Sequence, residues 1–335
     1  MLHVHCGDSS AEQLRKSEVA GDVIVWGDPV CDGPTPAHLT PHAWLEVRAA
    51  YLAAQSAHLT ADKVSAHLSA QDVALAQFSA HDEVVLWYDA CLFDQSILIR
   101  ALDWFAQHAL GATRVSLLCI GEFPGRSRFL GLGELNPAEL AALFPQRHTV
   151  TDEELALGQR AWAAYCAPDP TAVQQLIDDD TSALPYLREA LIRHLQQLPD
   201  RRDGLNRLER EILYVVRVAH ADPATIFTEV SATEARPFFG DTMLWHVIEE
   251  MACVPTPLLT LIGPGPLPRF DDSSSSALSA WTVGITALGS AVLAGQADAV
   301  HRRGIDRWVG GVHLGTYPTW RWDEEAGRVV RVDKS

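Results

Sequence analysis

The chain has 335 residues, of which 47% are hydrophobic and 21% are charged, which is typical of a soluble globular protein. Its formal charge is −17, and the acidic excess extends over the whole length, which excludes a broad basic surface for nucleic acid. No apolar run reaches the roughly 18 residues of a membrane-spanning helix, and the first residues lack signal-peptide features, so we expect a bacterial-type cytoplasmic protein without a membrane partner.

Apolar runs and acidic loops alternate at the start of the chain. Four runs, LHVHC, DVIVW, EVVLWY and RVSLLCI, are each followed by a short loop that carries an acid. We expect strands at 3–6, 22–26, 83–88 and 114–120, and helices at 10–16, 41–59, 61–78, 94–110 and 137–144. Strands that alternate with helices are typical of a parallel sheet covered on both faces. Residues 1–150 are therefore predicted to form an α/β, Rossmann-like three-layer domain that binds a ligand.

The rest of the chain is predicted to contain a helical connector and a smaller domain. Residues 151–203 are expected to form helices at 152–165, 170–178 and 184–197 that pack on the first domain. Helices at 205–219, 224–230 and 241–252 are followed by a strand at 257–262, a serine-rich gap and a further strand, which is the order of a winged helix. Residues 204–335 are therefore predicted to be a winged-helix-like α+β domain with a β hairpin in its Gly/Trp-rich tail.

Several longer stretches carry a resemblance to a known family. They are HVHCGDSSAEQL, GDVIVWGDPVCDGPTP, VVLWYDACLFDQSILIRALDWFA, RFLGLGEL, RAWAAYCAPDP, LPYLREALIRHLQQLPDRRDGLNRLEREIL and GIDRWVGGVHL. In these stretches, which span nearly the whole chain, the sequence resembles the bacterial family named domain of unknown function 1835. The family implies no activity, but it directs attention to the loops at 7–9, 28–34 and 89–95. Many relatives have E-H-D-L-[YF]-D-Q in the third loop, where Asp89, Ala90 and Cys91 stand here, so a histidine and an acid are missing.

The loops at the strand ends supply the candidate site residues. Because the carboxyl ends of parallel strands meet at one edge of a sheet, their acids are expected to gather there. Neighbouring carboxylates repel one another and a hard cation relieves that repulsion, so a Mg²⁺ site with Asp8, Asp28 and Asp89 is predicted. Asp28 and Asp89 are also the candidate catalytic residues. The candidate ligand-binding residues are Gly7, Asp8, Ser9, Asp32, Gly33, Arg48, Asp94 and Gln95, with Arg48 placed to neutralise a phosphate or carboxylate.

The same region has simpler interpretations. Aspartate often caps helices and forms turns, and Ser9 is expected to cap a helix more readily than to act as a nucleophile. The G-D-S sequence at 7–9 resembles the first block of GDS-type esterases, but the Gly-x-Asn-Asp and Asp-x-x-His segments of those enzymes do not occur. His3 and His5 share one face of a strand, where they either bind a metal or pack in the core. The six cysteines form no CxxC pair and are interpreted as reduced, buried residues in preference to a soft-metal or thiolate site.

Two functions from different classes fit these features. The preferred one is a hydrolase or transferase that binds a small phosphorylated or nucleotide-like ligand at the acidic strand ends, with an unknown cofactor or Mg²⁺. The alternative is a ligand-responsive regulator or interaction protein whose winged helix binds DNA or a partner. The helix at 241–252 contains three acids and no lysine or arginine, which disfavours nucleic acid, although Arg302, Arg303 and Arg307 would supply a basic patch. Self-association into a homodimer is a further expectation.

Overall fold

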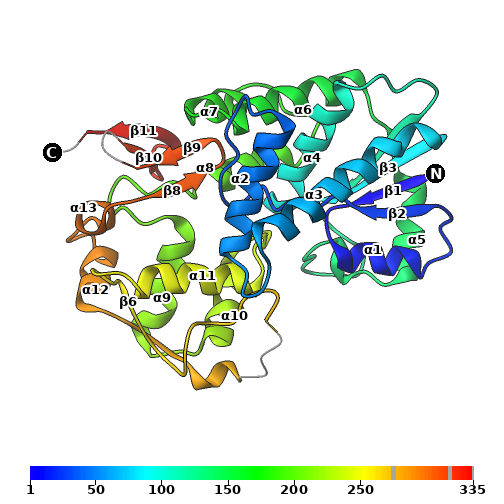
Figure 1. The fold of residues 1–335 in the computed structure, drawn as a ribbon. Helices are drawn as coiled ribbons and strands as arrows, with labels where there is room; N and C mark the ends of the chain where they lie inside the picture. The colour runs from blue at the N-terminus through cyan, green and yellow to red at the C-terminus, as the bar shows by residue number, and fades with distance from the viewer. Residues whose placement is uncertain (273–276, 316–318, 334–335) are drawn as a thin grey trace.

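The computed structural model describes residues 1–272, 277–315 and 319–333 (Figure 1). Its N-terminal part is built on a five-stranded sheet in the order β2-β1-β3-β4-β5, in which β5 runs antiparallel to β4 and the other pairs are parallel. A mostly parallel sheet followed by antiparallel hairpins confirms the predicted α/β fold class. The elements of this part are β1 (Leu2–His5), α1 (Asp8–Arg15), β2 (Asp22–Val25), α2 (Pro41–Ala54), α3 (Ala61–Ala76), β3 (Glu83–Asp89), α4 (Leu92–Ala106), β4 (Arg114–Ile120), α5 (Pro137–Leu143) and β5 (His148–Thr149).

Both faces of the sheet are covered, because apolar residues fill every position of the central strand. Side chains alternate along β3, so Val84 and Leu86 pack with α4 and α6 while Val85 and Trp87 pack with α1 and α5 on the opposite face. This arrangement gives the three layers that the alternating strands and helices predict. It also places the ends of β1, β2, β3 and β4 along one edge of the sheet (Figure 1).

The second half of the chain is helical first and then forms hairpins. Helices α9, α10 and α11 are followed by the antiparallel pair β6 and β7, which is the element order that the winged-helix interpretation requires. Among the described residues, no helix is long and apolar enough to cross a membrane. The elements are α6 (Asp152–Tyr165), α7 (Thr171–Asp178), α8 (Leu187–Leu195), α9 (Arg207–Val218), α10 (Pro223–Thr233), α11 (Asp241–Ala252), β6 (Leu259–Ile262), β7 (Thr282–Ile285), α12 (Ala287–Leu293), α13 (Ala299–Arg303), β8 (Arg307–Val309), β9 (Val312–Leu314), β10 (Thr319–Asp323) and β11 (Arg328–Val332).

Two hydrophobic cores meet beside the loop that follows β2. The larger core joins the sheet to α4, α6, α7 and α8, and it also contains Val309, Val312 and Trp322 from the last hairpins. The second core lies among α9, α10 and α11 and contains Cys31 and Leu92 from the N-terminal part. The C-terminal hairpins therefore return to the first core, and the loop at 28–34 lies where the two cores meet.

The differences from the predicted elements lie mainly at their ends. Helix α2 ends at Ala54 rather than at 59, and α4 begins at Leu92, so Asp94 lies in its first turn. Gly7 is the N-cap of α1 and makes no side-chain cap bond, so the prediction that Asp8 or Ser9 caps this helix is wrong. Strand β5 is absent from the sequence prediction, because its exposed residues carry no apolar pattern.

Candidate functional site

A buried ion pair organises the loop that follows β2. Arg48 on α2 is completely buried, and its Nε and Nη2 atoms donate to the Asp28 carboxylate at 2.9 and 2.8 Å. The Arg48 Nη1 atom donates to the carbonyl oxygens of Asp32 at 2.8 Å and Pro34 at 3.2 Å, and Nη2 also donates to that of Pro29 at 3.1 Å. Every nitrogen of this guanidinium is therefore used to hold the loop in shape.

This ion pair corrects the predicted roles of Asp28 and Arg48. The Asp28 side chain is also buried, and Arg100 Nη1 lies 3.5 Å from its second oxygen. Two guanidinium groups thus compensate the charge of Asp28 within the chain. Arg48 does lie at the strand-end edge, as predicted, but its donors are bound by the loop and none is left for a ligand. The pair fixes the position of Asp32 without itself being a metal or phosphate site.

The loop that follows β3 forms a second buried cluster. The Asp89 carboxylate accepts hydrogen bonds from the backbone N–H groups of Cys91 at 3.0 Å and Leu132 at 3.1 Å. The Asp94 carboxylate accepts from the backbone N–H of Asp89 at 2.7 Å and from the Cys6 thiol at 3.0 Å. These bonds join β1, β3, α4 and the turn at 132–134, so the cluster ties the strand ends together.

The predicted magnesium site is not assembled by these residues. Ligand atoms of Asp89, Cys91 and Asp94 lie within 4.8 Å of one another. In the described part of the chain, these are the potential metal ligands that lie close together. Asp8 lies on the exposed first turn of α1, and Asp28 is held by arginines, so neither joins that group. Gln95 is buried too, and its amide donates to the carbonyl oxygen of Asp89 at 2.7 Å, which is a bond within the fold.

Burial changes the acidity of this cluster. Loss of solvent raises the pKa of Asp89, and it raises the pKa of Asp94 well above its usual range, with the neighbouring Asp89 charge acting in the same direction. The folded protein therefore favours a proton on this pair of carboxyl groups. Arg48 and Arg100 form their ion pairs with Asp28.

We predict that this carboxyl pair makes stability fall with rising pH. A raised pKa in the folded state stabilises the protein below the ordinary aspartate pKa of about 4, and this contribution is lost as the pH rises through the folded pKa, at about 1.4 kcal/mol per unit of pKa difference. In Asp94→Asn the loss is expected to be smaller, because one of the two interacting acids is gone. Urea midpoints measured from about pH 4 upwards would test this. Glu122→Gln, on an exposed strand-end loop, is the control, and a wild-type pH slope in Asp94→Asn would contradict the prediction.

The loop that follows β1 offers no catalytic arrangement around its serine. Ser9 is exposed, and its hydroxyl donates to the carbonyl oxygen of Gly133 at 2.9 Å. His3 and His5 are buried with Trp87, whose indole donates to His3 Nδ1 at 3.1 Å and stacks on His5. Burial lowers the pKa of both histidines, that of His5 to about 3, so they pack as neutral core residues.

A cavity of about 290 Å³ lies between the loop at 28–34 and the C-terminal helices, and we call it the polar chamber. Two of the predicted ligand-binding residues, Asp32 and Gly33, line it. Gly33 has a φ of +77°, and a Cβ atom there would lie 2.4 Å from the Tyr51 ring, so only glycine lets the ring cover the loop. The other lining residues include Tyr51, Arg193, Gln197, Asn206, Phe238, His246, Glu250, Arg307 and Trp308.

Titratable groups converge on the polar chamber from both sides. Burial raises the pKa of Asp32, although a hydrogen bond from Tyr51 and the charge of Arg48 oppose that rise. On the facing helix α11, His246 Nε2 lies 3.3 Å from the Glu250 carboxylate. Burial raises the pKa of Glu250, but this hydrogen bond and the charge of Arg307 outweigh burial and lower it. The chamber therefore holds an acid with a raised pKa opposite an acid with a lowered pKa.

Arg193 contributes a buried cation to the same chamber. It is 9% exposed, and its Nε and Nη2 atoms donate to Glu234 at 3.0 and 2.6 Å. Its guanidinium carbon lies 4.7 Å from the centre of the Phe238 ring, which also lines the chamber. The remaining nitrogen, Nη1, is buried and has no hydrogen-bond partner among the described residues. Arg193 therefore keeps one buried donor, Nη1, that no described residue satisfies.

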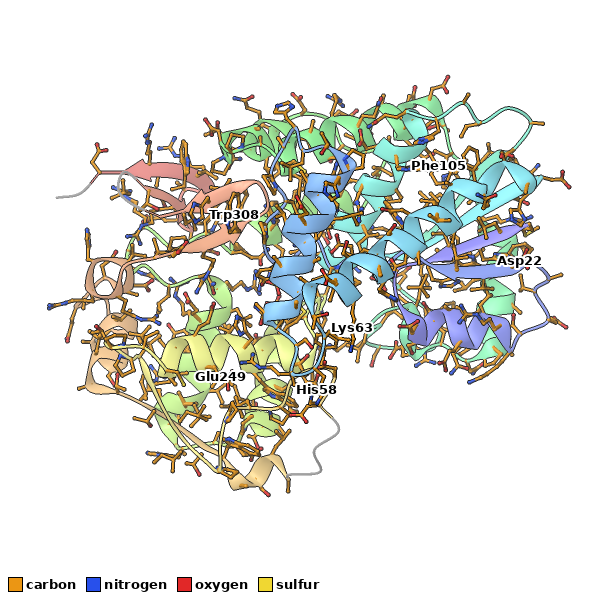
Figure 2. The ribbon with its side chains drawn as sticks, viewed as in Figure 1. Asp22, His58, Lys63, Phe105, Glu249 and Trp308 are labelled. Carbon is orange, nitrogen blue, oxygen red and sulfur yellow. The ribbon has the colours of Figure 1, made fainter. Side chains whose placement is uncertain are left out.

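A second cavity of about 560 Å³ adjoins the first, and we call it the apolar chamber. It shares Asp32, Met243 and His246 with the polar chamber, and we call the two together the junction cavity. Leu52 of α2 and Val64 and Leu68 of α3 form an apolar part of its wall. Lys63 at the start of α3 lies where this helix faces the C-terminal helices (Figure 2). Trp308, in the wall of the polar chamber, is on β8 (Figure 2).

Neither the known protein families nor the characterised proteins that were compared with this chain contain a match to it. The site must therefore be interpreted from its geometry. That geometry brings Asp32 and Gly33 into a cavity and places Gly7, Asp8, Ser9, Asp28, Arg48, Asp89, Asp94 and Gln95 outside its walls. The sequence prediction missed Arg193, although Ala190 and Arg193 are three residues apart and so share the buried face of α8.

Proposed function

We propose that the junction cavity binds a small molecule that carries a phosphate or carboxylate group, and that the protein hydrolyses this molecule or transfers a group from it. The unpartnered Nη1 of Arg193 carries this proposal. A buried donor without a partner costs about 1–3 kcal/mol. In this proposal a small rotation of the Arg193 side chain turns Nη1 to an oxyanion in the polar chamber, which satisfies it. The cost is otherwise unexplained in a guanidinium whose other nitrogens are paired so closely.

The place and the chemistry of the chamber support a ligand site. It lies beyond the carboxyl end of β2 and between two cores, which is where α/β proteins commonly bind ligands. Asp32, with its raised pKa, would give or take the proton that hydrolysis or transfer requires. Glu250, with its lowered pKa, would stay ionised and orient His246.

The alternative of a DNA-binding regulator has less support. Helix α11, which would be the recognition helix, turns Met243, His246 and Glu250 towards the cavity, and it contains no lysine or arginine. The face of α11 that carries Met243, His246 and Glu250 would contact the ligand instead. Membership of the domain of unknown function 1835 family, a cytoplasmic location and a homodimer stay as proposals that rest on the sequence.

We predict that Arg193→Lys abolishes anion binding while the protein stays folded. Lysine keeps a positive charge beside Glu234 but lacks the nitrogen that remains free in arginine. In the wild type, inorganic phosphate or acetate at constant ionic strength is expected to raise the melting temperature, because a ligand of the folded state stabilises it. In Arg193→Lys that rise is expected to vanish.

The matched control is Arg188→Lys, which changes an exposed arginine on the same helix outside the cavity. It is expected to keep the response of the wild type to both anions. Equal responses in the two variants would show that the anion binds elsewhere, and the absence of any response in the wild type would refute the proposed anion site.

A further inference from the structure

We propose that the ligand of the junction cavity is amphipathic, with its anionic head in the polar chamber and an apolar tail in the apolar chamber. This inference rests on the proposed function, because it takes the anion site at Arg193 as its starting point. It adds the chemical class of the substrate, an alkyl or acyl chain that ends in a carboxylate or phosphate.

The first step is the contrast between the two chambers. The polar chamber has charged side chains on several walls, among them Asp32, Arg193 and Arg307. The apolar chamber is larger, at about 560 Å³, and its inner wall is formed by Leu52, Val64 and Leu68. A cavity of that size lies in the range of about 300–1,000 Å³ that encloses organic ligands, so a small inorganic anion would leave most of the space unfilled.

The second step is the continuity of the two chambers. Asp32, Met243 and His246 belong to the walls of both, so the two chambers adjoin at these side chains. In this proposal one molecule extends past them from the first chamber into the second. Several polar residues of the apolar chamber are paired within the protein. Gln71 accepts a hydrogen bond from the backbone N–H of Gly27 at 2.9 Å and bonds to His67 through its amide nitrogen at 2.9 Å. A tail in this chamber therefore needs no polar groups of its own.

The third step concerns the mouth of the apolar chamber. Leu59 and Phe270 line it, and both are among the large hydrophobic side chains that remain exposed, with Phe270 at 55%. Apolar side chains gathered at the rim of a cavity are typical of a binding site for an apolar group. The Asp271 carboxylate, next to Phe270, accepts hydrogen bonds from the backbone N–H groups of Ala57 and His58, so the segments that carry Phe270 and Leu59 meet at the mouth.

The experiment measures the affinity of the full chain for two homologous series. The first is acetate, butyrate, hexanoate and octanoate, and the second is the matching alkyl phosphates, which tells a carboxylate head from a phosphate head. Each methylene that enters the apolar chamber is expected to lower Kd about fourfold. The gain should stop at the length at which the tail fills the chamber. Isothermal titration calorimetry below the micelle concentration gives the affinities.

Variants at the mouth locate the tail. Leu59→Asn and Phe270→Asn change exposed side chains, so both proteins are expected to fold, and the gain with chain length is expected to shrink for the longest members of each series. The matched control is Val73→Asn, an exposed valine on α3 that lies outside the cavity, and it should leave the whole series unchanged. Leu68→Trp, which fills the chamber from its inner wall, should remove the gain for every tail.

The outcomes separate the two proposals. Tight binding of short anions without any gain from longer tails would overturn the amphipathic ligand and leave the anion site standing. A gain with chain length that survives in both mouth variants and in Leu68→Trp would also overturn it, because the tail would then lie elsewhere. Failure of every anion to bind would overturn the anion site itself and, with it, this inference.

Discussion

Replacing Arg48 with methionine is expected to lower the free energy of unfolding by about 3–5 kcal/mol. The substitution removes the partner of the buried Asp28 carboxylate and leaves the carbonyl oxygens of Asp32 and Pro34 without a donor. Arg100, at 3.5 Å, is too distant to replace the bidentate contact. Because Arg48 and Asp28 are both buried, water cannot take over the lost bonds. Urea denaturation monitored by tryptophan fluorescence would measure the change.

Two further variants test this prediction. Arg48→Met combined with Asp28→Asn is expected to recover part of the lost stability, because the buried charge is then removed together with its partner. Arg160→Met is the control, since its pair with Asp179 is more than half exposed and is worth about 0–1 kcal/mol. If Arg48→Met cost no more than Arg160→Met, the ion pair would not organise the loop as its geometry implies.

The position and partners of Arg48 illustrate what the sequence can predict about a site. An arginine on the helix after a strand-end loop is within reach of that loop, and the structure confirms this much. Whether its partner is a ligand or an acid of the chain depends on the path of the loop, which local pattern does not specify. The same holds for Asp94, whose position after a strand predicts the edge but not the thiol and backbone groups that bind it.

More of the fold than of the site could be predicted from the sequence. Strand β4 and helices α6 and α11 have the bounds predicted, because apolar periodicity coincides with clear ends, as at the Thr151 and Glu154 capping box of α6. Helix α2 is an exception, since it ends before the predicted position and its buried residues include a charged one, Arg48. Periodicity assumes that charged side chains face solvent, and here tertiary pairing decides otherwise.

The junction cavity could not be derived from local pattern. Its walls come from the loop at 28–34 and from Arg193, His246 and Arg307, which are far apart in the sequence and meet only through the packing of the two cores. The sequence assigned Arg307 to a basic patch of the winged-helix-like module. In the structure Arg307 is held by Glu209 at 2.7 Å and lies in the wall of the polar chamber.

Replacing Gly311 with alanine is expected to lower the free energy of unfolding by about 1–3 kcal/mol and to abolish anion binding. A Cβ atom at this position would lie 1.9 Å from the carbonyl oxygen of Cys166, which is backbone at the end of α6 and cannot turn aside. The N–H of Gly311 donates to the carbonyl oxygen of Tyr165 at 2.9 Å, so the hairpin of β8 and β9 is seated directly on this helix end. Relief of the clash must move the hairpin.

Movement of that hairpin reaches the polar chamber, because β8 begins with Arg307 and Trp308, which line it. Urea midpoints and phosphate-dependent melting temperatures would therefore both change in Gly311→Ala. Gly315→Ala is the matched control at the end of the same hairpin, where the nearest side-chain atom, Cε1 of His313, is 3.9 Å from the added Cβ. A Gly311→Ala protein that lost stability but bound phosphate normally would show that the polar chamber does not depend on how β8 is seated. Loss of both stability and phosphate binding would show that the wall of the chamber depends on the close approach of Gly311 to the end of α6, which only glycine permits.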